Sequence, residues 1–177
     1  VSIPGTRFFL ENPMTAPSST IAFKTPAKVN LGLYILGKRE DGFHELETLF
    51  QMVNWCDEIK IECLGDGLDL ICNQPDIPND DGNLVIKAAR LLQTRFPDRC
   101  KGARIHLKKN IPHGAGLGGG SGNAAGTLLG LNFLWGLKLK REDLILMASE
   151  LGSDVPFFLL SPCAIGRSRG EILEPVN

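Results

Sequence analysis

The segment from Ile111 to Asn132 restricts the fold of this chain more than any other part of the sequence. Six of the residues from Gly114 to Gly122 are glycine, so this stretch is nearly bare backbone that can approach a ligand closely and adopt positive φ. An apolar run after Asn123 predicts a buried helix, and Ala103–Lys108 before the loop predicts a strand, whereas a flexible linker would not stand between two such elements. Free N–H groups at the start of a helix bind anions, so we expect the loop to bind a phosphate chain.

Three well-known phosphate-binding motifs do not fit this loop. Gly114–Gly119 satisfies the pattern G-x-G-x-x-G, but a dinucleotide-binding fold needs an acidic residue at the end of a second strand about twenty residues later, where Lys138–Leu144 instead predicts a helix. A P-loop needs Gly-Lys-Ser/Thr, yet Gly120 is followed by Ser121. A protein-kinase loop would need a valine after its last glycine and a place near the N-terminus. A nicotinamide-dependent dehydrogenase is therefore the weakest alternative, and a failure to bind NAD would exclude it.

Charge and composition exclude further classes of function. The chain has 19 Lys and Arg against 20 Asp and Glu, whereas proteins that bind nucleic acid or membrane surfaces usually carry a basic patch. No apolar stretch reaches the roughly 20 residues of a membrane helix. The five cysteines share no C-x-x-C spacing, which argues against structural zinc and disulfides and favours buried, reduced thiols in a cytoplasmic protein. We expect neither a nucleic-acid nor a membrane partner.

Alternation and helical spacing divide the chain from Ile21 onward into strands followed by helices. Alternation predicts strands at Val29–Leu36, Leu46–Val53, Asp57–Cys63, Leu68–Cys72 and Ala103–Lys108. The first of these strands is expected to have one apolar face, and the third and fourth are expected to form a hairpin. Helical spacing predicts helices at Asn83–Phe96, Ser121–Trp135 and Arg141–Leu151, the last ended by Gly152. Val155–Leu160 is expected to be a short apolar strand or buried segment. This order predicts an α+β fold, with a mixed or antiparallel sheet packed on helices.

The N-terminal residues are expected to lie outside the fold. Residues 1–20 contain Pro, Ser and Thr without periodicity and are expected to form an irregular leader, with Met14 as the natural start and residues 1–13 as upstream sequence. A processed transit peptide is a weaker alternative, because Arg7 is the only arginine before Lys24. The folded domain is then expected to span residues 21–177.

The loop Pro112–Ser121 resembles the phosphate loop of the GHMP small-molecule kinases, a family that includes galactokinase, homoserine kinase and mevalonate kinase. Three further segments resemble the branch of this family that phosphorylates a tertiary hydroxyl of a cytidylated methylerythritol in non-mevalonate isoprenoid biosynthesis. These segments are Thr25–Leu31, Gly37–Gln51 and Leu151–Phe158. The resemblance implies the N-terminal, ATP-binding domain of such a kinase, without the second domain that completes the acceptor pocket in the family.

The resemblance implies that Lys28 and Asp154 flank the acceptor hydroxyl, with Asp154 as the base and Lys28 holding charge on the hydroxyl and the phosphate. Phosphoryl transfer depends mainly on such positioning and electrostatic stabilisation. Asp154 precedes the apolar residues Val155–Phe158, where a bare carboxylate is costly unless a cation pairs with it. Taken alone, Asp154 would more often cap a turn after Gly152, and Lys28 would be a solvated strand lysine.

The resemblance also implies a nucleotide site, with ATP as cofactor and Mg²⁺ whose ligands it does not identify. Its residues would be Asn83, Leu84 and Lys109 around the adenine and Pro112, Gly114, Ala115, Gly116, Leu117, Gly118, Gly119, Gly120 and Ser121 around the phosphates. His113 either edges the adenine site or is a solvated loop histidine. Gly122 replaces a serine that is usual in the family, and we expect it to loosen the start of the helix.

For the acceptor, Phe43 and His44 resemble the cytosine-binding pair of the family, and Asn30, on the strand face of Lys28, is expected to reach the same cavity. A Phe-His pair in a tight turn otherwise serves most often for packing and surface. The expected partner is a small-molecule substrate, and the sequence indicates no oligomeric state. Two alternatives stay open: another GHMP-type alcohol kinase without a cytidine preference, and a non-catalytic nucleotide-binding module.

Overall fold

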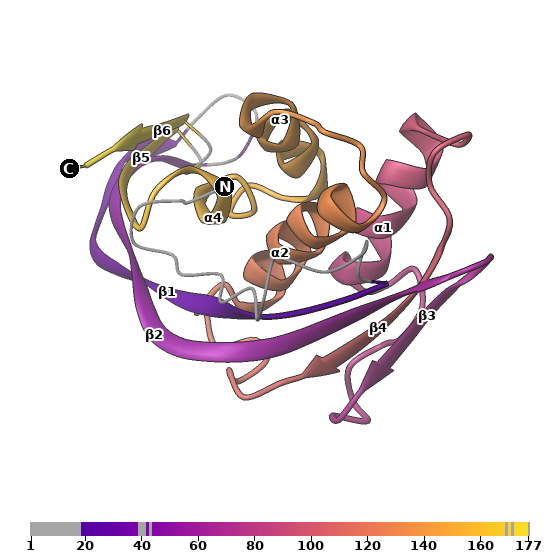
Figure 1. Ribbon diagram of the computed structural model, residues 1–177. Helices are drawn as coiled ribbons and strands as arrows, with labels where there is room; N and C mark the ends of the chain where they lie inside the picture. Colours follow the sequence, from indigo (N-terminus) through magenta and orange to yellow (C-terminus); the bar gives the residue numbers. More distant parts are fainter. Residues whose placement is uncertain (1–18, 39–41, 43, 169, 171, 177) are drawn as a thin grey trace.

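The computed structural model describes residues 19–38, 42, 44–168, 170 and 172–176, and there the chain forms a strongly curved sheet with helices inside the curve (Figure 1). The strands are β1 (Thr20–Lys38), β2 (His44–Leu64), β3 (Leu68–Cys72), β4 (Gly102–Lys108), β5 (Cys163–Ser168) and β6 (Ile172–Pro175). The helices are α1 (Leu84–Arg95), α2 (Gly119–Leu134), α3 (Arg141–Leu151) and α4 (Phe157–Leu160). The described strands form one mixed sheet in the order β3-β4-β2-β5-β6, with β1 also paired to β2. The predicted α+β class is confirmed.

The long strands β1 and β2 pair antiparallel from Thr20 opposite Glu62 to Lys38 opposite His44. The sequence predicted two strands where the structure has the continuous β2. That prediction was wrong because Asn54 and Trp55 are extra residues in β2, opposite the step from Pro26 to Ala27, and such a bulge interrupts the alternation without ending the strand.

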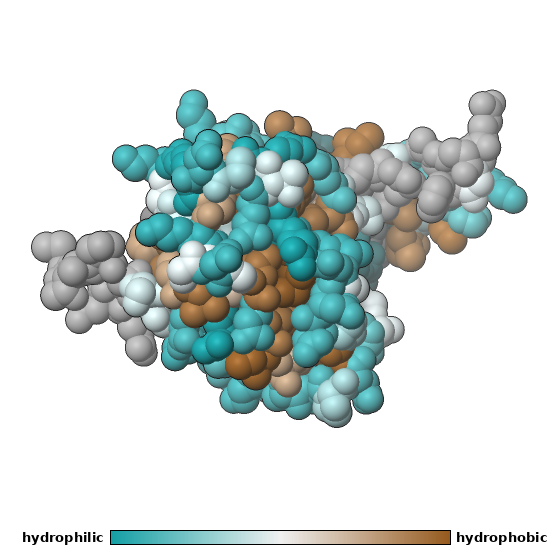
Figure 2. Space-filling model, turned by 90° about the vertical axis from the view of Figure 1, so that its right-hand side faces the viewer, coloured by the Kyte–Doolittle hydropathy of each residue, from teal (hydrophilic) through white to brown (hydrophobic). Residues whose placement is uncertain are grey.

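The far end of β1 is exposed on both faces. The alternation in Val29–Leu36 predicted one apolar face, but Leu31, Leu33 and Ile35 are 64%, 55% and 64% exposed. A register shift between Asn30 and Gly32 separates this end of the strand from the buried part. Apolar side chains also reach the surface, framed by polar ones, on the face seen in Figure 2.

The predicted hairpin between the second half of β2 and β3 does not form. Instead β4 lies between them, antiparallel to β2 and parallel to β3. Gly102 permits this insertion, because a Cβ there would lie 2.2 Å from the carbonyl oxygen of Asp66 in the turn before β3. The amide of Ala103 donates to the Gly67 carbonyl at 2.9 Å, and this hydrogen bond holds the start of β4 beside the turn that precedes β3. The turn between β2 and β3 therefore did not show that these strands pair, because β4, which comes later in the chain, occupies the edge of β2.

Two further strands, β5 and β6, follow the helices where no strand was predicted. β5 pairs with the first half of β2, and β6 pairs with β5. Gly166 lies so close to Phe50 that a Cβ would be 2.6 Å from the ring carbon Cε2. The chain thereby returns to the first half of β2, and β5 packs beside the Phe50 ring.

Helices α1 and α3 agree with the predictions. Asn83 is the N-cap of α1, where its side chain accepts a hydrogen bond from the amide of Val85 at 2.9 Å. α3 spans Arg141–Leu151 and ends at Gly152. The buried side chains of α1 are Val85, Ile86, Ala88, Ala89 and Leu92. The helix packs against α2, α3 and the sheet, which places Asn83 and Leu84 at the edge of the glycine-rich loop.

α2 begins earlier than predicted, at Gly119 rather than Ser121, because Gly118 adopts the left-handed conformation (φ 67°) and serves as the N-cap. Gly122 was expected to loosen this start, but it is buried in the first turns, and a Cβ there would lie 2.9 Å from the Pro26 carbonyl oxygen. Its lack of a side chain instead permits close packing on β1. The segment Val155–Leu160 contains the short helix α4, whose phenylalanines are buried.

A row of glycines on α2 determines how closely the helix approaches β1. The row recurs every fourth residue and therefore occupies one face of the helix: Gly118, Gly122, Gly126 and Gly130. At Gly126 a Cβ would lie 2.5 Å from the Thr25 methyl carbon and 2.8 Å from Phe23 Cε2. Thr25 Oγ1 also donates to Asn123 Oδ1 at 2.7 Å, so a buried hydrogen bond accompanies this contact.

The five cysteines are free, as predicted, but each is partly exposed rather than buried. Burial raises the pKa of the Cys56, Cys63 and Cys100 thiols, that of Cys100 to about 11. These thiols therefore stay protonated and poorly nucleophilic near neutral pH. Among the described residues, no helix is both long and apolar enough to span a membrane.

Gly130→Ala tests the close approach of α2 to β1. A Cβ there would lie 2.8 Å from Ile61 Cδ1 and 2.9 Å from Phe23 Cε1. We expect the free energy of unfolding to fall by about 1–3 kcal/mol because the core is overpacked. Gly120→Ala is the matched control: its nearest neighbour would be Leu84 Cδ1 at 3.9 Å, and alanine is favoured in helices by up to about 1 kcal/mol. Urea denaturation that gave both variants a gain in stability would contradict the interpretation.

Candidate active site

The glycine-rich loop presents backbone donors at the start of α2. Gly114, Gly116 and Gly118 all have positive φ, near 70°, which glycine adopts without a steric penalty. Gly118 supplies no side chain to cap the helix, so the amides of the first turn have no acceptor within the helix. Most of the loop is exposed, and it lies at the positive end of the helix dipole. This geometry suits an anion.

Lys28 is fixed directly against this loop. Its amide donates to the Leu117 carbonyl at 2.8 Å. Its side chain passes Gly118 so closely that a Cβ on the glycine would lie 2.8 Å from Lys28 Cγ and 3.0 Å from Phe158 Cζ. The glycine-rich loop and β1 therefore direct the lysine side chain together.

The ammonium of Lys28 lies 3.4 Å from the Asp154 carboxylate. It also donates to Asn30 Oδ1 at 2.7 Å and lies 4.9 Å from the centre of the Phe50 ring. The Lys28 side chain is only 7% exposed, whereas that of Asp154 is 34% exposed. A buried ammonium thus pairs with a carboxylate that is still accessible from the solvent side. Because Lys28 is buried, it is not the solvated strand lysine that the sequence left open.

Asn30 is held in turn by Thr48, a residue that the sequence analysis did not single out. Asn30 Nδ2 donates to Thr48 Oγ1 at 2.8 Å, and that hydroxyl donates to the Gly32 carbonyl at 2.7 Å. Thr48 is buried, and its neighbour Phe50 forms the apolar floor below the Lys28 ammonium. Both belong to the segment Thr48–Gln51 that carried part of the family resemblance, but only the pairing of β1 with β2 places them beside Lys28.

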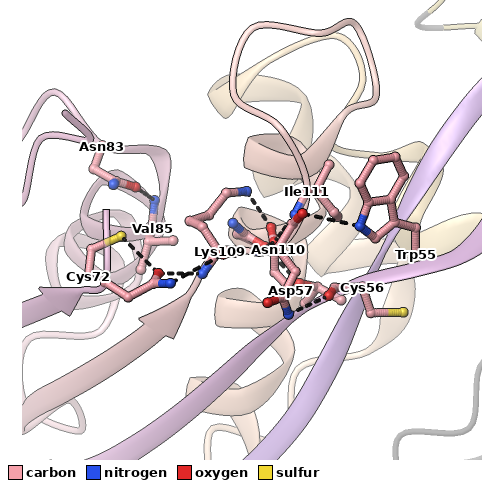
Figure 3. Close-up of polar contacts among 12 residues, drawn as sticks. Trp55, Cys56, Asp57, Cys72, Asn83, Val85, Lys109, Asn110 and Ile111 are labelled. Atoms are coloured by element: carbon pink, nitrogen blue, oxygen red, sulfur yellow. Dashed lines mark hydrogen bonds and ion pairs between the residues drawn. The ribbon is translucent and has the colours of Figure 1, made fainter. Parts of the chain in front are cut away.

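The predicted adenine residues lie on the other side of the loop. Asn83 caps α1 and donates to the Pro78 carbonyl at 2.8 Å, while Leu84 lies beside Gly120. The N-termini of α1 and α2 therefore converge. Lys109 is buried, and its ammonium binds Asp57 (Figure 3).

The backbone of Lys109 is also occupied. Its amide donates to Asn73 Oδ1 at 2.7 Å, and its carbonyl accepts from Asn73 Nδ2 at 3.3 Å. The amide, carbonyl and ammonium of Lys109 therefore all have partners within the protein. Neither Asp57 nor Asn73 showed a pattern in the sequence that would have identified it.

The predicted acceptor pair is only partly within the described residues. Phe43 lies outside them. His44 is the first residue of β2, exposed and opposite Lys38. It lies eight residues from Met52, the partner of Lys28, which is on the order of 25 Å of extended strand and less in space because β2 curves (Figure 1). The described residues therefore do not bring His44 into contact with Lys28.

The rest of the described structure holds no second candidate for this site. Within the described ranges, no group of three or more His, Cys, Asp or Glu residues could hold a metal ion. A hollow on the outer face of the sheet is lined by Lys24, Lys60, His106 and Lys108 and contains none of the predicted site residues. Glu58 pairs with Lys108 at 3.3 Å in this hollow, which is typical of a solvated sheet face.

Comparison with known proteins identifies the family of this fold. Residues 83–162 match the family model of the GHMP kinases N terminal domain. The chain is 50% identical over 167 residues to a 4-diphosphocytidyl-2-C-methyl-D-erythritol kinase of Prochlorococcus marinus (strain MIT 9515), covering 93% of this chain and 53% of that protein. The chain carries a GHMP kinase N-terminal domain. The fold and the family predicted from the sequence are thus confirmed.

Other relatives of this GHMP kinase domain give the same result. The enzyme of that name from Chloroherpeton thalassium (strain ATCC 35110 / GB-78) is 49% identical over 83% of this chain and 51% of its own length. A crystal structure of 4-(cytidine 5'-diphospho)-2C-methyl-D-erythritol kinase matches with a TM-score of 0.77 at 42% identity, over 88% of this chain and 55% of that one. The mevalonate kinase of Methanococcus jannaschii shares the fold at a TM-score of 0.70 and 15% identity, over 90% of this chain and 56% of that one. The chain spans about half the length of these relatives.

Gly118→Ala tests the junction between the loop and Lys28. The substitution places a side chain at positive φ and against Lys28 Cγ, so we expect a loss of about 1–3 kcal/mol in the free energy of unfolding. Because the lysine must shift, binding of ATP should weaken as well. Gly136→Ala is the control, since Gly136 also has positive φ (61°) but open space around its Cβ position. Equal effects of the two variants on ATP binding, measured by calorimetry, would show that Gly118 matters only through its backbone.

Proposed function

We propose that the protein carrying this domain transfers the γ-phosphate of ATP to a hydroxyl of 4-diphosphocytidyl-2-C-methyl-D-erythritol. The observation that carries the proposal is the Lys28–Asp154 pair, 3.4 Å apart, beside Gly118 at the N-terminus of α2. The names of the relatives described above support the choice of acceptor. In this proposal residues 21–177 are the ATP-binding domain, in agreement with the interpretation of the sequence.

In the proposed reaction, Asp154 accepts the proton of the acceptor hydroxyl, and the oxygen attacks the γ-phosphorus. The bond from this phosphorus to the bridging oxygen breaks, and ADP leaves. Lys28, which is buried and held by Asn30, stabilises the charge that develops between hydroxyl and phosphate. The amides from Gly114 to Ser121 bind the phosphate chain, so that positioning and electrostatics supply most of the catalysis.

Mg²⁺ fits this proposal through the chemistry of the available oxygen donors. Mg²⁺ is commonly held by one or two protein oxygens together with substrate phosphates and water, so it does not need a cluster of acidic residues. Ser121, in the first turn of α2, could supply one such oxygen. The ion would neutralise charge on the transferred phosphate.

For the acceptor, we propose that Phe43 and His44 bind the cytosine and that Asn30 faces the polyol. The curved β1–β2 ribbon connects His44 with Asn30, so an extended diphosphate-linked substrate could lie along it. A cytosine preference would distinguish this enzyme from other alcohol kinases of the family. Binding of ATP without transfer to any alcohol would favour a non-catalytic module instead.

Asp154→Ala should abolish turnover and leave ATP binding nearly intact. Loss of a general base typically lowers the rate by about 10²–10⁴-fold, while the amides of the loop stay in place. Phosphoryl transfer with ATP and the cytidylated methylerythritol measures the first effect, and calorimetry measures the second. Asp98→Ala, which removes an exposed carboxylate outside the site, is the control. Retained turnover in Asp154→Ala would refute the assignment.

Phe43→Ala tests the acceptor assignment. Base–aromatic stacking contributes about 1–3 kcal/mol, so we expect the affinity for cytidine diphosphate to fall by about tenfold. The affinity for ATP should not change. An unchanged affinity for cytidine diphosphate would count against the cytosine site.

A further inference from the structure

Asp57 is a fully buried carboxylate in the middle of β2, with three consecutive residues as its partners. Its relative exposure is 0%. Oδ1 accepts hydrogen bonds from the amides of Asn110 at 2.7 Å and Ile111 at 2.8 Å, and Oδ2 binds the ammonium of Lys109. These residues form the junction between the end of β4 and the glycine-rich loop, so one side chain determines the conformation with which the chain enters the loop.

Neighbouring residues hold the same junction from both sides (Figure 3). Trp55 Nε1 donates to the Asn110 carbonyl at 3.1 Å, and Asn110 Nδ2 donates to the Cys56 carbonyl at 2.9 Å. Asn73 binds both the amide and the carbonyl of Lys109. The bulge at Asn54 and Trp55 is separated from Asp57 by one residue, Cys56, and bulges commonly redirect side chains near sites of function.

The ion pair of Asp57 and Lys109 lies directly behind the first turn of α2. A Cβ on Gly119 would lie 3.0 Å from the Lys109 ammonium and 3.1 Å from Ile111 Cγ2. The carboxylate is thus matched by a cation rather than by the helix N-terminus. The same ion pair therefore lies against both the entry to the glycine-rich loop and the start of α2.

We propose that Asp57 is a positioning residue of the nucleotide site, which acts through Lys109–Ile111 to hold the loop in its anion-binding conformation. The inference rests on the proposed binding of ATP at this loop. A buried ion pair by itself is weak evidence for stability, because well-packed apolar residues often serve as well. The carboxylate is instead suited to orient two backbone amides and an ammonium at once.

The experiment compares ATP binding to Asp57→Asn and Asp57→Ala with binding to the unaltered chain. Asn keeps an oxygen that can accept from the amides of Asn110 and Ile111 but loses the ion pair, whereas Ala loses all three contacts. We expect the Kd for ATP to rise about threefold in Asp57→Asn and about tenfold or more in Asp57→Ala. Calorimetry at 10 °C, with the folded fraction of each variant measured by circular dichroism, keeps unfolding out of the Kd.

Two control variants separate positioning from stability. Leu144→Ala removes a buried side chain of α3 and should lower Tm without changing the Kd for ATP. Asp69→Asn removes an exposed carboxylate that pairs with Arg104 and should change neither quantity. Hydrogen exchange of the Asn110 and Ile111 amides should accelerate in Asp57→Ala only, because Asn keeps their acceptor.

The outcomes distinguish this inference from the proposed function. If the unaltered chain does not bind ATP, the proposed function fails. If the unaltered chain binds ATP and both Asp57 variants bind it equally well, Asp57 is only a structural residue and the inference is overturned. If Asp57→Ala does not fold, Asp57→Asn decides: a raised Kd supports the inference, and an unchanged Kd overturns it.

Discussion

The contact between the glycine face of α2 and β1 is the constraint on which the rest of the structure depends. Side chains at Gly122, Gly126 and Gly130 would collide with β1 and β2, so their absence sets the distance between helix and sheet. The same row of glycines continues to Gly118, where the helix begins beside Lys28. The close packing of α2 on the sheet therefore also brings the N-terminus of the helix to Lys28. A helix displaced from the sheet would separate the two.

β2 connects the two halves of the candidate site. Near its beginning, Thr48 accepts a hydrogen bond from Asn30, and Phe50 lies below the Lys28 ammonium, on the side of the proposed acceptor site. Near its middle, Asp57 holds the junction that leads into the glycine-rich loop. One continuous strand thus connects the residues that hold the glycine-rich loop with those that hold Lys28, beside the proposed base Asp154. The curvature of the strand, with the bulge at Asn54 and Trp55, allows residues so far apart in the strand to face one region.

Local patterns in the sequence predicted the elements well where the physics is local. The helix predicted over Asn83–Phe96 and the end of α3 at Gly152 follow from helical spacing and backbone conformation, and both agree with the structure. Strand pairing was predicted less well, because the competition between β3 and β4 for an edge of β2 depends on Gly102, far along the chain.

The residues of the candidate site likewise fall into those that a local pattern predicts and those that depend on distant parts of the chain. The glycine-rich loop has a direct physical pattern, whereas Lys28 and Asp154 were found only through family resemblance. Their proximity arises from β1 packing on the loop and could not be derived from spacing. Asp57 had no pattern at all, since a single acid inside an apolar strand indicates burial only when its partners are known.

The composition of α2 has a consequence for how the domain folds. Five of its residues are glycine, each of which disfavours an isolated helix by about 1 kcal/mol relative to alanine. Such a segment has little tendency to nucleate a helix before its partners are in place. The helix should therefore form only as it docks on the β1–β2 ribbon, late in folding. Partly folded chains would then lack the positive helix terminus entirely, and the capacity to bind an anion would arise together with the native core.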